Sequence, residues 1–249
     1  KTIGFQTAFE ESGLLVVEKK KPFLRQSCLY HDTVFLKPST GVSVEMIVHH
    51  DRLLDHQAPY FVLVGTPERS FFSTETNFKG VIQKAVEQAL GMRVVQQFLE
   101  EFQLFYFQPN NATDLDAGIA LVALEYTDLN LAIEFWQNGI GFQTKKISDG
   151  NSPSWVLLQF NSPVSAWSLK LLLIESLAAP KTYYLDDSGW TCLSFIVTSI
   201  EKTLERLVPF GITDVGSPYS ILIGGRPMRL CFFRGPEKKL MELIQIEQE

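Results

Sequence analysis

The sequence predicts an α+β fold of paired β-α-β-β-β units, arranged as two modules in which the first unit is truncated at its N-terminus. Two observations support this fold class. The pentapeptide Ile-Gly-Phe-Gln-Thr occupies residues 3–7 and recurs unchanged at residues 140–144, which indicates an internal repeat. From residue 119 onward, hydrophobic periodicity also gives the order strand, helix, strand, strand, strand twice. One such unit cannot cover both faces of its own sheet, so the units are expected to pair.

The first complete unit begins with an alternating run at residues 119–126, which predicts a strand. Thr127 and Asp128 then predict the N-cap of a helix, and Asn138-Gly139 predicts its end. Turn residues separate three further strand candidates at residues 141–146, 155–160 and 169–175.

The second complete unit follows a polar linker at residues 180–189. Thr198 and Glu201 have the spacing of a capping box, which predicts a helix from Thr198. Gly224-Gly225 predicts a hairpin turn. The strands expected in this unit are residues 190–197, 212–215, 219–223, 228–233 and 240–246.

The N-terminal half shows weaker periodicity. It predicts a helix at residues 77–90 and strands at 42–48, 60–65, 92–97 and 102–108. Only two residues precede the first copy of the pentapeptide, so the repeat predicts a further strand and helix upstream of residue 1. A linker at residues 110–114 divides the chain into an N-terminal module, residues 1–112, and a C-terminal module, residues 117–249.

Composition excludes several classes of function. The 249 residues are 45% hydrophobic and 20% charged, which is typical of a folded globular protein. The 22 Lys and Arg against 28 Asp and Glu give a net charge of -6, which argues against nucleic acid and anionic membrane surfaces as partners. No apolar run is long enough to span a bilayer. The three widely spaced cysteines, without a visible targeting signal, favour reduced thiols and a cytoplasmic location.

The sequence lacks the common catalytic motifs. It contains no phosphate-binding glycine-rich loop, no dinucleotide fingerprint, no Cys-x-x-Cys pair and no Gly-x-Ser-x-Gly elbow. No histidine follows His56, so a nucleophile in the C-terminal module would need a histidine from the other module. Cys192 is therefore interpreted as a buried, unreactive thiol.

Two segments of the C-terminal module carry a family resemblance. Asp128 opens a helix that ends in Phe-Trp-Gln-Asn-Gly-Ile-Gly-Phe at residues 135–142, and residues 232–243 form a Pro-containing hairpin that ends near Glu242. This arrangement resembles the vicinal oxygen chelate superfamily, which includes glyoxalases, bleomycin-resistance proteins and extradiol dioxygenases. The resemblance implies a glyoxalase-like fold in which each module curls into a cup. In metal-binding members, the first and last strands of the units carry His, Glu or Gln ligands.

The family's ligand positions do not predict a metal site in the C-terminal module. They fall on Leu121, Lys170, Cys192 and Glu242, of which only Glu242 has the expected side chain. In the N-terminal module the resemblance points to Glu45, with Tyr60 and Gln103 at the other positions. His49 is a further candidate, because all four histidines lie between residues 31 and 56. Their surroundings lack apolar alternation, so a solvated loop is favoured over a metal site.

The expected ligand site is the C-terminal cup. Trp155 and Trp190 begin strands that line the cup in this fold, where aromatic side chains hold flat apolar ligands. Lys170 and Glu242 share their strand faces with apolar residues, so they are expected to form an ion pair across the cup. The candidate ligand-binding residues are Trp155, Lys170, Trp190, Cys192, Ser194 and Glu242.

The first functional hypothesis is a metal-independent protein that binds or sequesters a small organic ligand without a cofactor. The alternative is a metal-dependent enzyme, a lyase or a ring-cleaving dioxygenase, with Fe, Mn, Ni or Zn in the N-terminal module. Glu45 and a donor from the expected upstream strand would hold the metal, with His49 as a further candidate. A third possibility is a regulator with no active cup, so enzymatic activity stays open. The expected assembly is a monomer or a weak homodimer, because the paired modules would cover each other's sheet edges.

Overall fold

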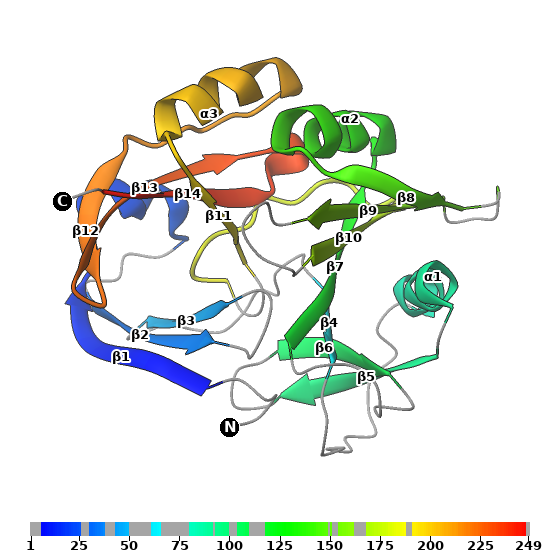
Figure 1. Ribbon diagram of the computed structural model, residues 1–249, viewed down its shortest axis with the longest axis horizontal. Helices are drawn as coiled ribbons and strands as arrows, with labels where there is room; N and C mark the ends of the chain where they lie inside the picture. Colours follow the sequence, from blue (N-terminus) through cyan, green and yellow to red (C-terminus); the bar gives the residue numbers. More distant parts are fainter. Residues whose placement is uncertain are drawn as a thin grey trace.

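The structure is a computed structural model, and it describes residues 6–25, 30–37, 43–49, 61–65, 80–91, 93–99, 104–109, 118–148, 150, 154–161, 168–187 and 191–247. Within these residues the strands form three sheets (Figure 1). Their orders are β1-β2-β3, β5-β6-β4-β7-β10-β9-β8 and β11-β14-β13-β12. The mixed sheets and few helices confirm the predicted α+β class.

The seven-stranded sheet joins strands from both halves of the chain. Its C-terminal strands are β7 (Gly118–Tyr126), β8 (Gln143–Ile147), β9 (Trp155–Asn161) and β10 (Ser168–Glu175). Its N-terminal strands are β4 (Phe61–Gly65), β5 (Val94–Leu99) and β6 (Leu104–Pro109). β7 pairs in parallel with β10 and antiparallel with β4, so β4 and β7 connect the two halves of this sheet.

The four-stranded sheet repeats the order of the C-terminal half of the larger sheet. Its strands are β11 (Leu193–Val197), β12 (Tyr219–Ile223), β13 (Arg226–Arg234) and β14 (Leu240–Ile246). In both cases the first strand lies beside the last strand in parallel. Gly224 and Gly225 have φ values of 55° and 76° in the predicted turn between β12 and β13, a conformation that glycine adopts without steric cost. The strand expected at residues 212–215 is reduced to a single bridge between Thr213 and Arg234.

The three-stranded sheet contains β1 (Gln6–Leu15), β2 (Tyr30–Lys37) and β3 (Val44–His49). Gln6 begins β1 and Gln143 begins β8, and each of these strands is the edge of three consecutive antiparallel strands. The last two residues of each pentapeptide copy, Gln6-Thr7 and Gln143-Thr144, therefore lie at corresponding places, whereas residues 3–5 lie outside the described residues. Phe142 is buried, whereas Phe5 lies outside the described residues.

Two helical segments cover the outer side of the C-terminal strands (Figure 1). The first is α2 (Leu129–Glu134), which continues as the π-helical turn η3 (Phe135–Ile140). The second is α3 (Ile200–Leu207), followed by the 3₁₀ turn η4 (Val208–Phe210). Shorter 3₁₀ turns are η1 (Glu18–Phe23) and η5 (Pro236–Lys238). No helix among the described residues is long and apolar enough to cross a membrane.

The helix boundaries differ in part from the sequence prediction. Asp128 is the N-cap of α2, and its carboxylate accepts a 2.9 Å hydrogen bond from the amide of Leu131, as predicted. The helix runs past Asn138-Gly139 and ends at Gly141, which has a φ of 105°. The capping box at Thr198 is wrong, because Ser199 is the N-cap and accepts from the amide of Lys202. Starting the helix at Ile200 places that residue fully inside the core.

The main core lies between these helices and the sheets. Trp136 packs edge-on against Phe135 and Phe142, and its Nε1 donates to the hydroxyl of Tyr126 at 3.1 Å. The helices meet at Gly139, where an added Cβ would lie 2.9 Å from the Leu207 side chain. A larger residue at this position would force the Leu207 side chain to shift. The same core contains buried residues from Val122 to Leu243, so both C-terminal units contribute to it.

Helix α1 (Gly80–Leu90) lies on the opposite face of the seven-stranded sheet (Figure 1). Ala85, Val86 and Ala89 pack there against side chains of β7, β9 and β10. Trp155 donates from Nε1 to the side-chain oxygen of Gln88 at 3.2 Å. The inner side of this sheet is therefore filled by the protein's own helix.

The predicted modules, residues 1–112 and 117–249, stay a prediction as independent folding units. The strand pairing itself continues across the boundary, because β4 lies beside β7. The C-terminal units thus share a core on their helical side. On their inner sides they pack against different N-terminal segments, α1 in the first unit and the segment around η1 in the second.

Glu237 closes the N-terminus of α2, and we expect Glu237→Ala to lower the free energy of unfolding by about 2 kcal/mol. Its Oε1 accepts hydrogen bonds from the amides of Thr127 at 2.6 Å and Asp128 at 2.8 Å, and from the Thr127 hydroxyl at 2.8 Å. Urea unfolding measures the loss. Glu237 and Lys238 both have left-handed φ values, of 53° and 60°, so Lys238→Ala is the matched control. Equal losses in both variants would show that the cap contributes nothing.

Candidate functional site

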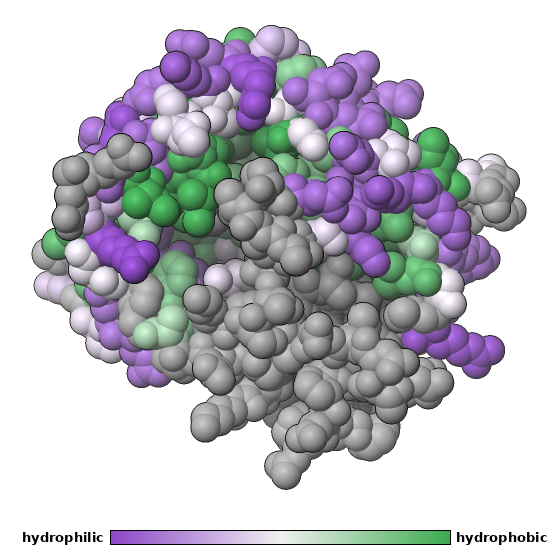
Figure 2. Space-filling view, viewed as in Figure 1, coloured by the Kyte–Doolittle hydropathy of each residue, from purple (hydrophilic) through white to green (hydrophobic). Residues whose placement is uncertain are grey.

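The candidate site lies on the inner side of the four-stranded sheet, opposite the helices. Tyr219, Leu230, Phe232 and Leu240 form an apolar wall there. The segment after β1 packs against this wall through Val16, Phe23 and Leu24. Figure 2 shows hydrophobic side chains gathered around a hollow in this part of the molecule.

The Glu242 carboxylate, from β14, lies within this apolar wall. Glu242 is 5% exposed, and it lies opposite Ser194 of β11 in the strand register. The Ser194 hydroxyl donates to its Oε2 at 2.6 Å. Burial, with the nearby charge of Glu45 as a second cause, raises the pKa of Glu242 to about 7. Glu242 therefore holds a proton for part of the time at neutral pH.

Glu45 reaches the same region from β3. Burial among protein atoms raises the pKa of Glu45 above its ordinary value, and the charge of Lys20 lowers it. Glu45 is nevertheless an exposed residue. Its charge raises the pKa of Glu242, so the two carboxylates lie near each other.

The cation of this site is Lys20, from the turn η1. Lys20 is 8% exposed, and its charge lowers the pKa of both Glu45 and Glu242. Its Nζ lies 5.9 Å from the centre of the Phe232 ring, within the range of a cation–π interaction. Among the described residues it forms no direct ion pair or hydrogen bond. The ammonium group is therefore held near the carboxylates without binding directly to either.

The charges of Glu45 and Glu242 also affect the pKa values of Cys192 and Tyr219. Burial, then Glu242 and Glu45, raise the pKa of the Cys192 thiol well above its ordinary value. Burial and the same two carboxylates also raise the pKa of Tyr219. Both groups are neutral at physiological pH. Because a thiol reacts as its thiolate, a raised pKa does not activate Cys192 as a nucleophile. The residue is half-buried rather than buried as expected from the sequence.

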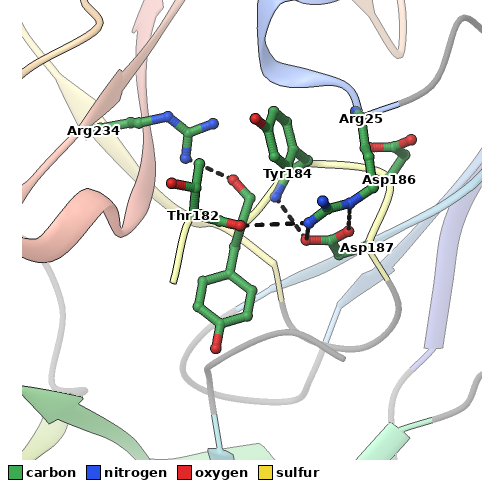
Figure 3. Close-up of polar contacts among 7 residues, drawn as sticks. Arg25, Thr182, Tyr184, Asp186, Asp187 and Arg234 are labelled. Atoms are coloured by element: carbon green, nitrogen blue, oxygen red, sulfur yellow. Dashed lines mark hydrogen bonds and ion pairs between the residues drawn. The ribbon is translucent and has the colours of Figure 1, made fainter. Parts of the chain in front are cut away.

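The segment at residues 182–187 fixes η1 and hence Lys20 (Figure 3). The guanidinium of Arg25 binds the buried Asp187 in a fork, with distances of 2.7 Å from Nε and 3.0 Å from Nη2. The Arg25 amide donates to Asp186 at 2.6 Å, and the Leu185 amide donates to the Phe23 carbonyl at 2.9 Å. These bonds tie the end of η1 to the linker between the two C-terminal units.

Arg234 fixes the other side of the same linker (Figure 3). Its Nη1 donates to the Tyr183 carbonyl at 2.6 Å and to the Lys238 carbonyl at 3.1 Å. The Tyr184 ring lies between two guanidinium groups, 4.6 Å from Arg25 and 5.0 Å from Arg234. The segment at residues 182–187 is thus joined to β13 as well as to η1.

The structure brings together three of the six predicted ligand residues, Cys192, Ser194 and Glu242. Trp155 lies elsewhere, packed against α1 on the seven-stranded sheet. Trp190 lies outside the described residues. Glu45 joins the cluster, whereas for His49 only the backbone pairing with His31 is described. Whether any of these residues binds a ligand stays a prediction.

The expected ion pair between Lys170 and Glu242 is wrong. Lys170 belongs to the seven-stranded sheet, opposite Leu121 and Gln159. Glu242 belongs to the four-stranded sheet and has Ser194 as its hydrogen-bond partner. Strand parity correctly placed Glu242 on an inner face. Strand parity could not show that Lys170 and Glu242 belong to different sheets, because it does not report which strands pair.

Sequence reasoning missed Lys20. It lies in the run Lys19-Lys20-Lys21, and such runs are ordinarily solvated. Its neighbours Val16, Phe23 and Leu24 are buried, and their spacing around the lysine run is the signal that one lysine could face inward.

The described residues do not fit a divalent metal. A divalent metal needs three or more donor side chains that converge on one point. Within the described ranges, no group of three His, Cys, Asp or Glu side chains is close enough to hold one.

Comparison of the sequence with protein-family models and with curated proteins finds no match. Solved structures do resemble this one. Glyoxalase I from Zea mays has a TM-score of 0.55 and 12% identity, covering 97% of this chain and 84% of that chain. A mutant of that protein gives a TM-score of 0.53 over 97% and 85% of the two chains, again at 12% identity. The fosfomycin resistance protein FosX from Listeria monocytogenes covers 53% of this chain and 96% of its own, with a TM-score of 0.40 and 16% identity.

The chain therefore has a glyoxalase-like fold, as the resemblance of its sequence motifs predicted. The likeness to glyoxalase I extends over both halves of the chain. At 12% identity it defines the fold and leaves the chemistry of the site to the residues themselves.

Proposed function

We propose that this protein binds a small organic ligand, without a metal, in the hollow between the three-stranded and four-stranded sheets. The observation that carries the proposal is the composition of this hollow. An apolar wall that includes Tyr219 and Phe232 surrounds a few polar groups, Glu45, Glu242 and Lys20. Largely apolar pockets with few, fixed polar groups are typical of small-molecule sites.

Access to the hollow is open along β11. In the seven-stranded sheet, β7 has neighbours on both sides, and Ala123 is 1% exposed. β11 has one neighbour among the described strands, and the corresponding residue of the last unit, Ile196, is 72% exposed. Ala123 pairs with Leu172, which lies two residues after Lys170 in β10. Ile196 pairs with Ile244, which lies two residues after Glu242 in β14. The comparison supports a route for a ligand at the edge of the smaller sheet.

The inner face of the seven-stranded sheet is a weaker candidate. Helix α1 packs its apolar side there, against Leu121, Trp155 and Leu172. Lys146 donates from Nζ to the carbonyl of Gln88 at 3.0 Å and adds a polar contact to this closure. A ligand would first have to displace the helix, so the proposal places one site in the chain.

Neighbouring positions of β12 provide the test, with the neutral fluorescent probe N-phenyl-1-naphthylamine. Ile221 packs against the apolar wall, whereas Leu222 points to the opposite face and is largely exposed. We expect the probe to bind the wild-type chain in the micromolar range, as a small apolar molecule does in a pocket of this kind. Ile221→Trp should weaken binding by about tenfold or more, because the larger ring fills the pocket.

Leu222→Trp is the matched control and should leave probe binding within about twofold of wild type, since strand neighbours face opposite sides. No saturable binding, or equal effects of the two substitutions, would contradict a ligand site in this hollow. Elemental analysis of the purified chain tests the metal-independent part. About one Fe, Mn, Ni or Zn ion per chain, lost when Glu45 or Glu242 is replaced by Gln, would overturn it.

A further inference from the structure

We propose that the Ser194 hydroxyl is a nucleophile with the Glu242 carboxylate as its base, and that the two groups hydrolyse small, uncharged esters in this hollow. The inference rests on the proposed function and adds a reaction to it. Its basis is a direct hydrogen bond, in which Ser194 Oγ donates to Glu242 Oε2 at 2.6 Å. A hydroxyl that donates to an adjacent base meets the first requirement of nucleophilic catalysis.

The two side chains differ in exposure as a nucleophile and a base should. Ser194 is exposed on the edge strand β11, so its oxygen can reach a ligand. Glu242 is 5% exposed and lies opposite Phe232 in the strand register. Water therefore competes little for its carboxylate, which strengthens the hydrogen bond to the serine. Burial also raises the pKa of Glu242 to about 7, so most of the carboxyl is ionised at pH 8 and is ready to accept a proton.

The fold itself does not require a hydroxyl and a carboxylate at these positions. In the other C-terminal unit, the same parallel pairing of first and last strands places Leu121 opposite Lys170. In the last unit, the pairing of β11 with β14 places Ser194 opposite Glu242. The sheet therefore fixes the two backbone positions before a substrate binds, which preorganises the pair.

The free edge of β11 supplies donors for the negative oxygen that forms during acyl transfer. In the part of the chain that the structure describes, the amides of Leu193–Val197 have no hydrogen-bond partner other than β14. An edge strand presents alternate amides on its unpaired side. Amides next to Ser194 are therefore available to a substrate oxygen, as in an oxyanion hole.

The reaction balances with water as its only co-reactant. Ser194 Oγ bonds to the acyl carbon and its proton moves to Glu242, which passes that proton to the alcohol oxygen as the ester C–O bond breaks. Water then attacks the acyl-serine and gives a proton to Glu242, which returns one to Ser194 as the acid leaves. The apolar wall with Tyr219 and Phe232 suits an uncharged substrate with an apolar group.

Paraoxon, an uncharged phosphate triester with an aromatic leaving group, tests the inference at pH 8. We expect the wild-type chain to release about one equivalent of p-nitrophenol and to keep a diethylphosphoryl group on Ser194, located by peptide mass spectrometry. Ser194→Ala should take no label. Glu242→Gln should be labelled about 100-fold more slowly, because glutamine cannot accept the proton. Both variants should lose turnover of p-nitrophenyl butyrate by about 100-fold or more, while circular dichroism shows that they fold.

A second serine–glutamate pair provides the matched control. Ser220 Oγ donates to Glu247 Oε1 at 3.1 Å, but this pair is exposed, and Ser220 points to the face of β12 opposite that of Tyr219 and Ile221. Ser220→Ala and Glu247→Gln should leave labelling and turnover within about twofold of wild type, because water competes for an exposed carboxylate. Loss of activity in these variants equal to that in Ser194→Ala would overturn the assignment.

The two proposals can fail separately. If N-phenyl-1-naphthylamine binds and Ile221→Trp blocks it, but paraoxon labels Cys192, a surface residue or nothing, then the hollow is a ligand site and the ester inference is overturned. Turnover that persists in Ser194→Ala would also overturn it. If the probe does not bind and Ser194 takes no label, the proposed function fails together with the inference.

Discussion

Asp187→Ala should lower the free energy of unfolding by about 3 kcal/mol, because it leaves a buried network without its acceptor. The Asp187 carboxylate receives three hydrogen bonds, two from the Arg25 guanidinium at 2.7 Å and 3.0 Å and one from the Tyr184 amide at 2.9 Å. Breaking a buried pair by removing one partner costs about 3–5 kcal/mol. Arg25 keeps part of its surface in solvent, so the lower end of this range is expected.

Urea unfolding at pH 7 measures this loss, and a double-mutant cycle with Arg25→Met assigns it to the pair. The expected coupling energy is about 1.5 kcal/mol or more, as for other close, charge-assisted pairs. Asp214→Asn is the control, because Asp214 has a left-handed φ of 48°, which asparagine tolerates. Asp214 also binds an arginine of this region, Arg234 at 3.3 Å, but it is 63% exposed, and exposed pairs contribute at most about 1 kcal/mol. Equal effects of the two substitutions would contradict the network's role.

The same pair should matter for the ligand site, since it holds the segment that carries Lys20. The Arg25 amide and the Phe23 carbonyl both bind the linker. This connection could not be predicted from the sequence. It joins residues 161 and 162 positions apart, and neither periodicity nor a local motif reports such a contact.

Local patterns predicted the elements well where strand parity and turn chemistry agree. The strands at 219–223 and 240–246 have the predicted bounds, because Gly224-Gly225 fixes one end and alternation fixes the face. The N-cap at Asp128 was also predicted from local residue chemistry. In contrast, β2 was not predicted, because its charged and apolar residues alternate weakly.

Only part of the candidate site was predicted from the sequence. Parity placed Glu242 on an inner face, and burial confirms it. The partner across the hollow depends on which units share a sheet, and β4 and β7 join units from opposite halves of the chain. Lys170 therefore faces the side filled by α1, and Lys20 supplies the cation near Glu242.

Replacing Glu242 with Gln should remove a pH dependence of stability of about 3 kcal/mol. The Glu242 carboxyl has a pKa of about 7 in the folded protein and about 4.5 when exposed, chiefly because burial penalises its charge. Below pH 4.5 both states are protonated, so the group causes no loss of stability. As pH rises from 4.5 to 7, the unfolded chain releases the proton first, and the folded state loses stability relative to it. Above pH 7 the loss is complete.

The measurement compares the free energy of unfolding of wild type and Glu242→Gln from pH 4 to pH 8. The variant should match wild type near pH 4 and exceed it by about 3 kcal/mol at pH 8. Glu45→Gln should move the midpoint of this difference to lower pH, since the charge of Glu45 is the second cause of the raised pKa. Lys20→Met should move it to higher pH, because Lys20 lowers the pKa.

Glu201→Gln is the control, because it removes an exposed carboxyl whose pKa is lowered by backbone and Arg229 contacts. Its stabilisation is present at neutral pH and is lost as pH falls, which is the opposite sign. A difference between wild type and Glu242→Gln that stays flat across the range would show that Glu242 is solvated in the folded protein.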